Sequence, residues 1–261
     1  MRISLIVTTY NRADALFLVL KSIKNQSCEP FEVIIADDGS NNLTKTIIDE
    51  FSETSNLNVI HSFQEDLGFR AAESRNKAIA KASGDYIILI DGDMLLHPKF
   101  INDHAKNATQ GFYIQGSRVL LSQIKTEKVL ISKDISLNIL DNGLNNKLNG
   151  IYSTFLAKFF STKSSFLKGV KSCNMSFYRK DCIKVNGFNG SFIGWGREDS
   201  EFVIRLFNNG VKRKNLKFSA IQYHLWHDEF NRSSLTVNDE LLNKTISQNL
   251  NWCEIGIDKF L

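Results

Sequence analysis

Proline, cysteine and long apolar runs are all scarce in this sequence. Only two prolines occur among 261 residues, and no low-complexity tract repeats, which excludes collagen-like and proline-rich classes. The longest uninterrupted apolar stretches, 15–20 and 86–90, are far shorter than the roughly 20 residues that a membrane-spanning helix needs. The four cysteines are widely spaced without a CxxC pair, so we expect reduced thiols and no disulfide framework or zinc site. The apolar run after Arg2 is too short for a secretory signal, and we expect a cytoplasmic protein.

The rest of the composition is typical of a folded protein. Hydrophobic residues make up 43% and charged residues 23% of the chain, and its length is ample for a sizeable core. Such a length suggests one large α/β unit or two smaller domains. The net charge of +4 is too small to indicate a nucleic-acid-binding protein, so we expect no nucleic-acid partner.

One stretch of the chain carries positive charge only. Residues 142–180 contain no Asp or Glu. Within it, the lysines and phenylalanines of 147–171 could hold the protein peripherally against anionic lipid, or could bind an acidic oligosaccharide. The near-helical spacing of Phe155, Phe159 and Phe166 fits equally well an amphipathic helix whose rings enter the core. The cations of the stretch are Lys147, Lys158, Lys163, Lys168, Lys171, Arg179 and Lys180.

Strand and helix patterns alternate through the first hundred residues. Apolar runs predict strands at 3–8, 31–36, 59–63 and 86–90, and helical spacing predicts helices at 13–24, 44–51 and 70–82. This alternation is typical of an α/β protein with a mainly parallel sheet and helices on both faces.

The second half of the chain is less regular. The pattern predicts strands at 112–121 and 173–178 and helices at 198–208 and 237–250. Nothing separates this part as an independent domain. We therefore expect one domain over 1–261, with a first half at 1–110 and a second half at 111–261.

Polar clusters follow each of the four predicted strands of the first half. They lie at 8–11, 37–40, 65–69 and 91–93. Because ligands of open parallel sheets bind beyond the carboxyl ends of the strands, we expect these clusters to share one binding edge.

Asp91, Gly92 and Asp93 come directly after the buried-type strand 86–90. Two carboxylates at such a strand end suit Mg²⁺ or Mn²⁺ that holds a substrate's phosphates, and the glycine permits close backbone approach. An isolated DGD tripeptide is more often a solvated turn. Its position after the strand favours the metal site.

Glu198 and Asp199 open a predicted helix after the glycine–tryptophan run 194–196. Acidic residues in a first helical turn are explained by the helix dipole alone. The Gly-Trp-Gly loop, however, would let Trp195 approach a ligand closely. An adjacent carboxylate could then accept a proton from a hydroxyl group.

His224 and His227 lie three residues apart. They could complete a metal site begun by Asp93, in which case Mn²⁺ suits the mixed ligands better than Mg²⁺. A pair of structural or surface histidines is the alternative interpretation.

These motifs together resemble glycosyltransferase family 2, whose members have the GT-A fold. The resemblance spans most of the chain and rests on segments 7–12, 37–40, 84–86 and 91–93. Segment 194–199, Gly-Trp-Gly-Arg-Glu-Asp, is similar to the GWGxED element of chondroitin-polymerase-like and β-1,4-galactosyltransferase-like enzymes, and it is more specific than DxD alone. The resemblance implies a Rossmann-like nucleotide-sugar-binding half, 1–110, merged with a mixed α/β half, 111–261, for acceptor binding and catalysis.

The resemblance also implies where a UDP-sugar donor binds. Its base and ribose would lie near Thr8, Tyr10, Arg12 and Asp37. Arg75 would contact the diphosphate. Asp91 and Gly92 would face the ribose and a metal-bound water, and Trp195 would pack against a sugar.

The metal and catalytic roles follow from the same resemblance. Asp93 would contact Mn²⁺ or Mg²⁺, with His227 and His224 as the candidate further ligands. The galactosyltransferase pattern has methionine at the position of His224, which leaves the choice between the two histidines open. Asp199 would be the general base and Glu198 a sugar-binding carboxylate.

The implied reaction is an inverting, metal-dependent transfer of a hexose or N-acetylhexosamine from a UDP-sugar to a saccharide or lipid-linked saccharide. A bacterial surface polysaccharide or lipooligosaccharide is the expected product. Two other interpretations remain: a haloacid-dehalogenase-like phosphatase, which also places DxD after a strand, and a non-catalytic carbohydrate-binding protein on the same fold. Met94 and Leu95 after Asp93 fit the phosphatase pattern poorly.

Overall fold

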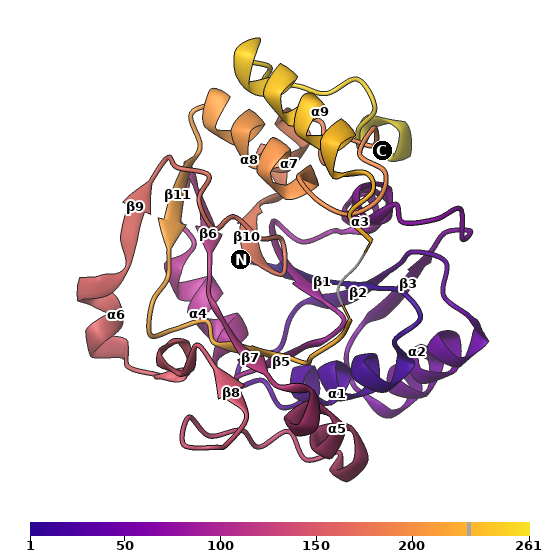
Figure 1. Ribbon diagram of the computed structural model, residues 1–261, viewed down its shortest axis with the longest axis vertical. Helices are drawn as coiled ribbons and strands as arrows, with labels where there is room; N and C mark the ends of the chain where they lie inside the picture. The colour runs from indigo at the N-terminus through magenta and orange to yellow at the C-terminus, as the bar shows by residue number, and fades with distance from the viewer. Residues whose placement is uncertain (229–230) are drawn as a thin grey trace.

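The computed structural model describes residues 1–228 and 231–261. Within them, the larger of two sheets has eight strands, which connect the two halves of the chain. Their order is β3 (Val59–Phe63), β2 (Glu32–Asp37), β1 (Ile3–Thr9), β4 (Tyr86–Asp91), β10 (Asn174–Tyr178), β6 (Phe112–Gln115), β11 (Lys212–Asn215) and β9 (Thr162–Ser164). The first four strands are mutually parallel, whereas β10 runs antiparallel to both β4 and β6. The predicted parallel half and mixed half are thus confirmed (Figure 1).

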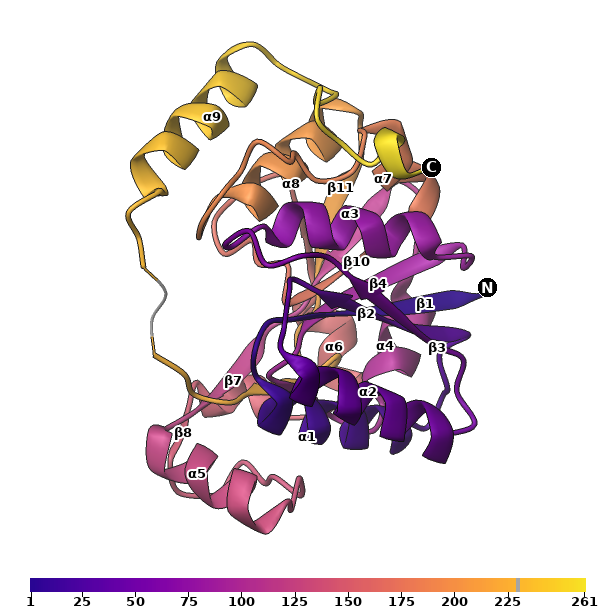
Figure 2. The same cartoon turned by 90° about the vertical axis from the view of Figure 1, so that its right-hand side faces the viewer.

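Helices cover both faces of the parallel strands, as predicted (Figure 2). On one face, Leu5 and Val7 of β1 pack in a core with α1 (Ala13–Lys24) and α2 (Asn42–Thr54). On the other face, Ile6 packs in a second core with α3 (Ala71–Lys81). Burial on both faces explains why β1, β2 and β4 are mostly apolar.

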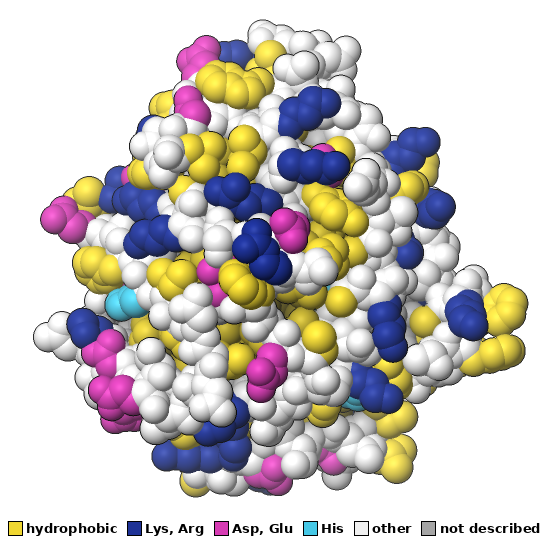
Figure 3. Space-filling view, turned by 180° about the vertical axis from the view of Figure 1, so that it is seen from behind, with side chains coloured by type: hydrophobic (Ala, Val, Ile, Leu, Met, Phe, Trp, Pro, Cys, Tyr) yellow, Lys and Arg dark blue, Asp and Glu magenta, His cyan; other side chains and the backbone are white. Residues whose placement is uncertain are grey.

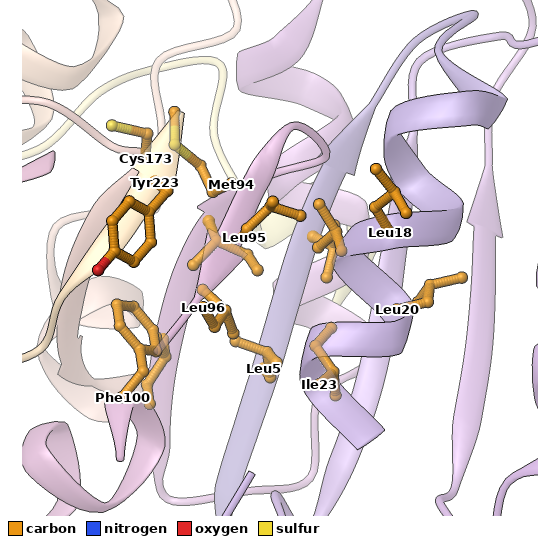
Figure 4. Close-up of a cluster of buried hydrophobic side chains, with 14 of the residues drawn as sticks. Leu5, Leu18, Leu20, Ile23, Met94, Leu95, Leu96, Phe100, Cys173 and Tyr223 are labelled. Atoms are coloured by element: carbon orange, nitrogen blue, oxygen red, sulfur yellow. The ribbon is translucent and has the colours of Figure 1, made fainter. Parts of the chain in front are cut away.

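The smaller sheet anchors the turn that follows β4. Its order is β5 (Met94–Leu96), β12 (Gln222–His224), β7 (Arg118–Leu121) and β8 (Leu144–Asn145). Leu95 of β5 is buried in the same core as Leu5 and α1, which Figure 4 shows in close-up. The turn at 91–93 is therefore held between two buried strands.

The predicted strand 112–121 is wrong as a single element. It is divided into β6 and β7, which belong to different sheets. The chain breaks at Gly116, whose amide donates to the carbonyl of Asn174 at 2.9 Å. A Cβ at Gly116 would lie 2.3 Å from the Asn174 side chain, so the close crossing requires glycine.

The remaining helices surround the second half of the sheet. Near the C-terminus, α8 (Glu198–Asn208) packs beside α9 (Leu235–Ser247), where Thr245 donates to the buried Glu201 at 3.1 Å. These helices agree with those predicted at 198–208 and 237–250. The others are α4 (Phe100–Asn107), α5 (Gln123–Ser132), η1 (Lys147–Gly150), α6 (Thr154–Phe160), α7 (Arg179–Lys184) and η2 (Asp258–Phe260).

The phenylalanines of the positively charged stretch do not enter the core. Helix α6 has no buried residue, and Phe155, Phe159 and Phe166 are 67%, 69% and 75% exposed. The interpretation as an amphipathic helix with inward rings is therefore wrong. Among the described residues, no helix combines the length and apolar character needed to span a bilayer.

Candidate active site

The carboxyl ends of β1 and β4 open onto one cavity of about 370 Å³. Residues 170–173 and the start of α8 also line it. Asp93 and Asp199, predicted as metal ligand and base, thus line the same cavity although they come from different halves of the chain. The predicted site residues in its lining are Thr8, Tyr10, Arg12, Arg75, Asp91, Gly92, Asp93, Trp195, Glu198, Asp199 and His227.

Asp38, rather than the predicted Asp37, lines the cavity. Asp37 is 1% exposed; its carboxylate lies 2.9 Å from Nε2 of His61 and accepts from the Ser40 amide at 2.8 Å. Burial alone would raise the pKa of Asp37, but these hydrogen bonds lower it overall. Side chains alternate along a strand, so two consecutive aspartates at its end point in different directions.

Arg75 links the two halves of the site. This arginine of α3 is 4% exposed, and its Nη1 lies 3.0 Å from Oε1 of Glu198. Its Nη2 is 3.6 Å from Oδ1 of Asp91, and its Nε donates to Oγ1 of Thr8 at 3.3 Å. A buried cation shared between carboxylates from both halves holds the walls of the cavity in a fixed relation.

Asp93, His224 and His227 form a group with the geometry of a metal site. Oδ2 of Asp93 lies 3.4 Å from Nε2 of His224 and 3.5 Å from Nε2 of His227, and the three ligand atoms lie within 4.8 Å of one another. Strand β12 brings the histidines there, because His224 pairs with Met94 of β5 and the Leu225 amide donates to the Asp93 carbonyl at 3.0 Å. His224 does not line the cavity but completes this group.

The group also fits a divalent cation in its chemistry. Oδ1 of Asp93 is buried and has no hydrogen-bond partner in the described part of the chain, which is costly unless a ligand satisfies it. Burial alone would raise the pKa of Asp93, but His224 and His227 lower it overall, so the carboxylate is ionised as a metal ligand must be. One oxygen and two imidazole nitrogens suit Mn²⁺ better than Mg²⁺.

Asp199, at the start of α8, lies in an environment that shifts its pKa. Burial, followed by the charge of Glu198, raises its pKa to about 7. Its Oδ1 accepts from the amide and the hydroxyl group of Ser200 at 2.6 and 3.2 Å, which orients the carboxylate. A base with a pKa near neutrality is well matched to general-base catalysis.

The loop before α8 presents Trp195 at the rim of the cavity, where its side chain is 37% exposed. Gly194 has φ +77°, and a Cβ there would lie 2.3 Å from the hydroxyl of Ser234 at the start of α9. The guanidinium of Arg232 lies 5.4 Å from the Trp195 ring centroid. The indole thus packs against Arg232, which precedes α9, and the loop at Gly194 lies close to Ser234.

Sequence reasoning missed several residues of the cavity wall. A single strand over 112–121 would not place Arg118 at the cavity, whereas the break at Gly116 brings β7 beside the site. Lys171 was predicted within 147–171 as part of a surface for anionic lipid or an acidic oligosaccharide, but not as a residue of this cavity. The other missed lining residues are Thr9, Asp38, Phe69, Ala71, Val170, Ser172, Cys173, Gly196, Arg197, Ser200 and Leu235.

Solved structures share this architecture. The structure of S. aureus TarS 1-349 in complex with UDP-GlcNAc matches all of this chain and 70% of that chain, with a TM-score of 0.66 and 18% identity. A mannosyltransferase from Pyrobaculum calidifontis in complex with GDP-Man and Mn²⁺ matches 87% of this chain and 58% of that chain, with a TM-score of 0.59 and 17% identity. These matches confirm the predicted GT-A fold.

Curated relatives are longer than this chain. Chondroitin synthase of Escherichia coli is 28% identical over 242 residues, and hyaluronan synthase of Pasteurella multocida is 30% identical over 238 residues. Each match covers 85% of this chain but only 34% and 24% of the relative, so the chain spans about a third or less of these proteins.

Family models give the most direct assignment. The model of the N-terminal domain of galactosyltransferase matches residues 157–228, which include segment 194–199 and both histidines of the metal group. The model of glycosyl transferase family 2 matches residues 4–178, which carry the strand-end clusters, Arg75 and Asp93. Because that match covers more than half of the residues, the chain belongs to glycosyl transferase family 2.

Proposed function

We propose that this protein is an inverting, metal-dependent glycosyltransferase that moves a hexose or N-acetylhexosamine from a UDP-sugar to a saccharide acceptor. The observation that carries the proposal is that one cavity is lined both by Asp93 of the metal group and by the carboxylate of Asp199. The polysaccharide synthases among the relatives favour a role in bacterial surface polysaccharide or lipooligosaccharide synthesis.

The donor is proposed to bind along the strand ends of the first half. Thr8, Tyr10, Arg12 and Asp38 line this part of the cavity and would surround the nucleoside. We retain Asp37 as a residue that supports this wall through His61 and Ser40 without facing the ligand. UDP is favoured as the nucleotide because the similar TarS structure contains UDP-GlcNAc.

The diphosphate is proposed to lie between Asp93 and Arg75. Asp93, His224 and His227 would hold Mn²⁺, or less favourably Mg²⁺. When bound, such a cation supplies Lewis-acid stabilisation of the charge that develops on the leaving diphosphate. Asp91 and the backbone at Gly92 would contact the ribose side of the donor.

Asp199 is the proposed general base. It would accept the proton of an acceptor hydroxyl as the oxygen attacks the anomeric carbon from the face opposite the diphosphate. The bond to the diphosphate breaks in the same displacement, so the configuration inverts and a UDP-α-sugar gives a β-glycoside. Glu198, fixed by Arg75, would bind a sugar hydroxyl, and Trp195 would pack on the donor or acceptor sugar.

The other two interpretations of the sequence are less well supported. The match to glycosyl transferase family 2 over 4–178 includes the DxD segment and argues against a haloacid-dehalogenase-like phosphatase. A non-catalytic carbohydrate-binding protein would have no need for a carboxylate with a pKa near 7 beside a metal group. The GWGxED element supports, in our proposal, a place in the chondroitin-polymerase-like and galactosyltransferase-like subgroup.

We also propose that the protein acts at the inner face of a membrane, through the stretch 147–171. Phe155, Phe159 and Phe166 are exposed there beside Lys158 and Lys163, and the stretch contains no acidic residue. In Figure 3, hydrophobic and basic side chains lie together on the protruding right-hand edge, where α6 lies. Exposed aromatic rings flanked by lysines suit the interface of an anionic bilayer.

A thermal-shift experiment tests the donor and metal assignments together. Ligands that bind the native state raise its stability by mass action. We expect UDP and UDP-sugars to raise the melting temperature in the presence of Mn²⁺, and Asp93→Ala to remove this effect.

Asp49→Ala is the matched control, because this exposed carboxylate of α2 lies outside the cavity lining and pairs only with the exposed Lys45 among the described residues. No response of the unaltered protein to any nucleotide, with or without Mn²⁺, would overturn the proposed function.

A further inference from the structure

A second cavity, of about 260 Å³, adjoins the candidate active site. Arg118, Lys171 and Cys173 line both cavities, so the two share a wall. We name the second one the basic pocket, because its described lining contains Arg118, Lys171, Arg213 and Lys217 but no Asp or Glu.

The basic pocket is built by elements of the second half. The β6–β7 break contributes Gly116 and Ser117, the region of η1 contributes Asn146 and Asn149, and the end of β11 contributes Asn215. None of the strand-end residues 8–12 or 91–93, and none of residues 195–200, lines it. It is therefore placed to hold a part of a ligand that is separate from the nucleotide.

Among the described residues, the cations of the basic pocket form no ion pair with a carboxylate; these cations are Arg118, Lys171, Arg213 and Lys217. Arg213 is 7% exposed and donates through Nη1 to the carbonyls of Phe166 and Lys168 at 3.2 and 2.8 Å. These neutral carbonyls fix Arg213 in place and leave its positive charge uncompensated.

Two donors of the pocket are also unsatisfied. Nε of Arg118 and Nε of Arg213 are buried and have no hydrogen-bond partner among the described residues. Such buried donors are costly, and a bound acceptor atom would relieve the cost. Burial and the nearby charge of Arg118 lower the pKa of Lys171, which is a sign that the cations repel one another.

The polar residues of the lining complement a negatively charged, hydroxylated ligand. Asn149 donates to the Arg118 carbonyl at 3.0 Å and accepts from Nζ of Lys217 at 3.4 Å, so it orients this lysine at the rim. Oε1 of Gln222 is buried, has no hydrogen-bond partner in the part of the chain that the structure describes, and could accept from a hydroxyl group. Cations with amide groups in one concave site are the chemistry of saccharide anion recognition.

We propose that the basic pocket binds an anionic group of the acceptor, a carboxylate or a phosphate, and thereby places an acceptor hydroxyl next to Asp199. The inference rests on the proposed glycosyltransferase function and adds the substrate class. Arg118 and Lys171 line both cavities, so an anionic group bound by them lies next to the cavity that Asp199 lines.

The pocket also lies next to the exposed phenylalanines. The Lys217 amide donates to Oγ of Ser161 at 3.3 Å, and Asn215 donates to Oγ of Ser164 at 3.1 Å, so the end of β11 is tied to the chain that follows α6.

Binding of matched ligand pairs tests the proposal. With UDP and Mn²⁺ present, calorimetry compares an oligosaccharide ending in glucuronic acid with its carboxyl-reduced counterpart, and glucose 1-phosphate with glucose. We expect the charged member of at least one pair to bind about tenfold tighter, with a preference that declines at high salt. The pair with the larger preference identifies carboxylate or phosphate as the recognised group. Equal binding of charged and neutral members in both pairs would overturn the inference.

Variants locate the binding site. Lys217→Gln and the double variant Lys171→Gln/Lys217→Gln should progressively reduce the preference for the charged ligand. Lys212→Gln is the control, because this exposed lysine also lies on β11 but does not line the pocket. UDP affinity of Lys217→Gln should stay unchanged.

If UDP itself displaces the anionic ligand, the anion occupies the donor site and the inference fails. If instead UDP never binds while the charged ligands do, the proposed function fails and the basic pocket stands as an anion site alone.

Discussion

Arg75 of α3 and Glu198 of α8 form an ion pair, with Nη1 3.0 Å from Oε1, that joins the nucleotide-facing wall of the cavity to the wall that carries the proposed base. Neither residue belongs to the metal group. Their side chains are 5% and 13% exposed, so the pair is largely removed from solvent. The relative position of the two half-sites thus depends on a buried electrostatic contact as well as on the continuous sheet.

Glu198→Gln should therefore destabilise the protein. Removal of one partner from a buried ion pair typically costs about 3–5 kcal/mol, and Asp91, 3.6 Å from the same guanidinium, reduces this to roughly 1–3 kcal/mol. Urea denaturation measures the change in the free energy of unfolding. Asp239→Asn, which breaks the exposed pair with Arg197, is the control and should cost about 0–1 kcal/mol. Equal effects of the two variants would contradict a structural role for the Arg75–Glu198 pair.

The pH dependence of transfer should report Asp199. Burial raises the pKa of this carboxyl to about 7, and only its ionised form can accept a proton. We expect kcat/KM, measured by UDP release, to fall about tenfold per pH unit below about 7, because this ratio reflects ionisation in the free enzyme. Asp199→Asn should lower kcat by about 100-fold or more and abolish this acidic limb. A variant that retains the acidic limb would assign it to another group.

The same substitution should stabilise the fold. An ordinary aspartate titrates near pH 4, so between about pH 4 and 7 the unfolded chain loses this proton while the native state still holds it, and native stability declines as the pH rises. Asp199→Asn removes that penalty and can still accept from Ser200 through its amide oxygen. We expect its melting temperature to exceed that of the unaltered protein by about 2–4 °C at pH 8, with no difference at pH 4. A lower melting temperature at pH 8 would show that the carboxylate is a stabilising group.

The sequence predicted the first half of the fold closely because its signals are local. The strands β1, β2 and β4 are almost wholly buried. The end of the apolar run of β4 therefore identified Asp91 and Asp93 directly. The second half depends on contacts between distant segments. Gly116 gives no local sign that it divides 112–121 between two sheets, and for that reason Arg118 and the basic pocket were not foreseen.

Two groups of site residues also could not be placed from local sequence patterns alone. Asp37 and Asp38 are adjacent, and the direction of the chain at the end of β2 decides which carboxylate faces the cavity. His224 and His227 lie close to Asp93 because β12 pairs with β5, and this pairing between distant segments has no local sequence signal. In both cases the residue types indicated the chemistry. Which side chains face the cavity or come together at Asp93, however, is set by the folded sheet.

Membrane contact through α6 makes a separate prediction. The rings of Phe155 and Phe159 are 67% and 69% exposed, and burial of such a side chain in a bilayer interface is worth about 1.5–3 kcal/mol. We expect the protein to float with liposomes that contain anionic lipid and to be released by high salt, and the double variant Phe155→Ser/Phe159→Ser to stay in the soluble fraction. Ile124→Ser/Ile131→Ser on α5, whose side chains are 68% and 83% exposed, controls for a general loss of surface hydrophobicity and should still float. Since neither phenylalanine lines the cavity, UDP should raise the melting temperature of both double variants equally. An unaltered protein that remains entirely soluble beside anionic liposomes would show that the exposed rings of α6 serve another contact.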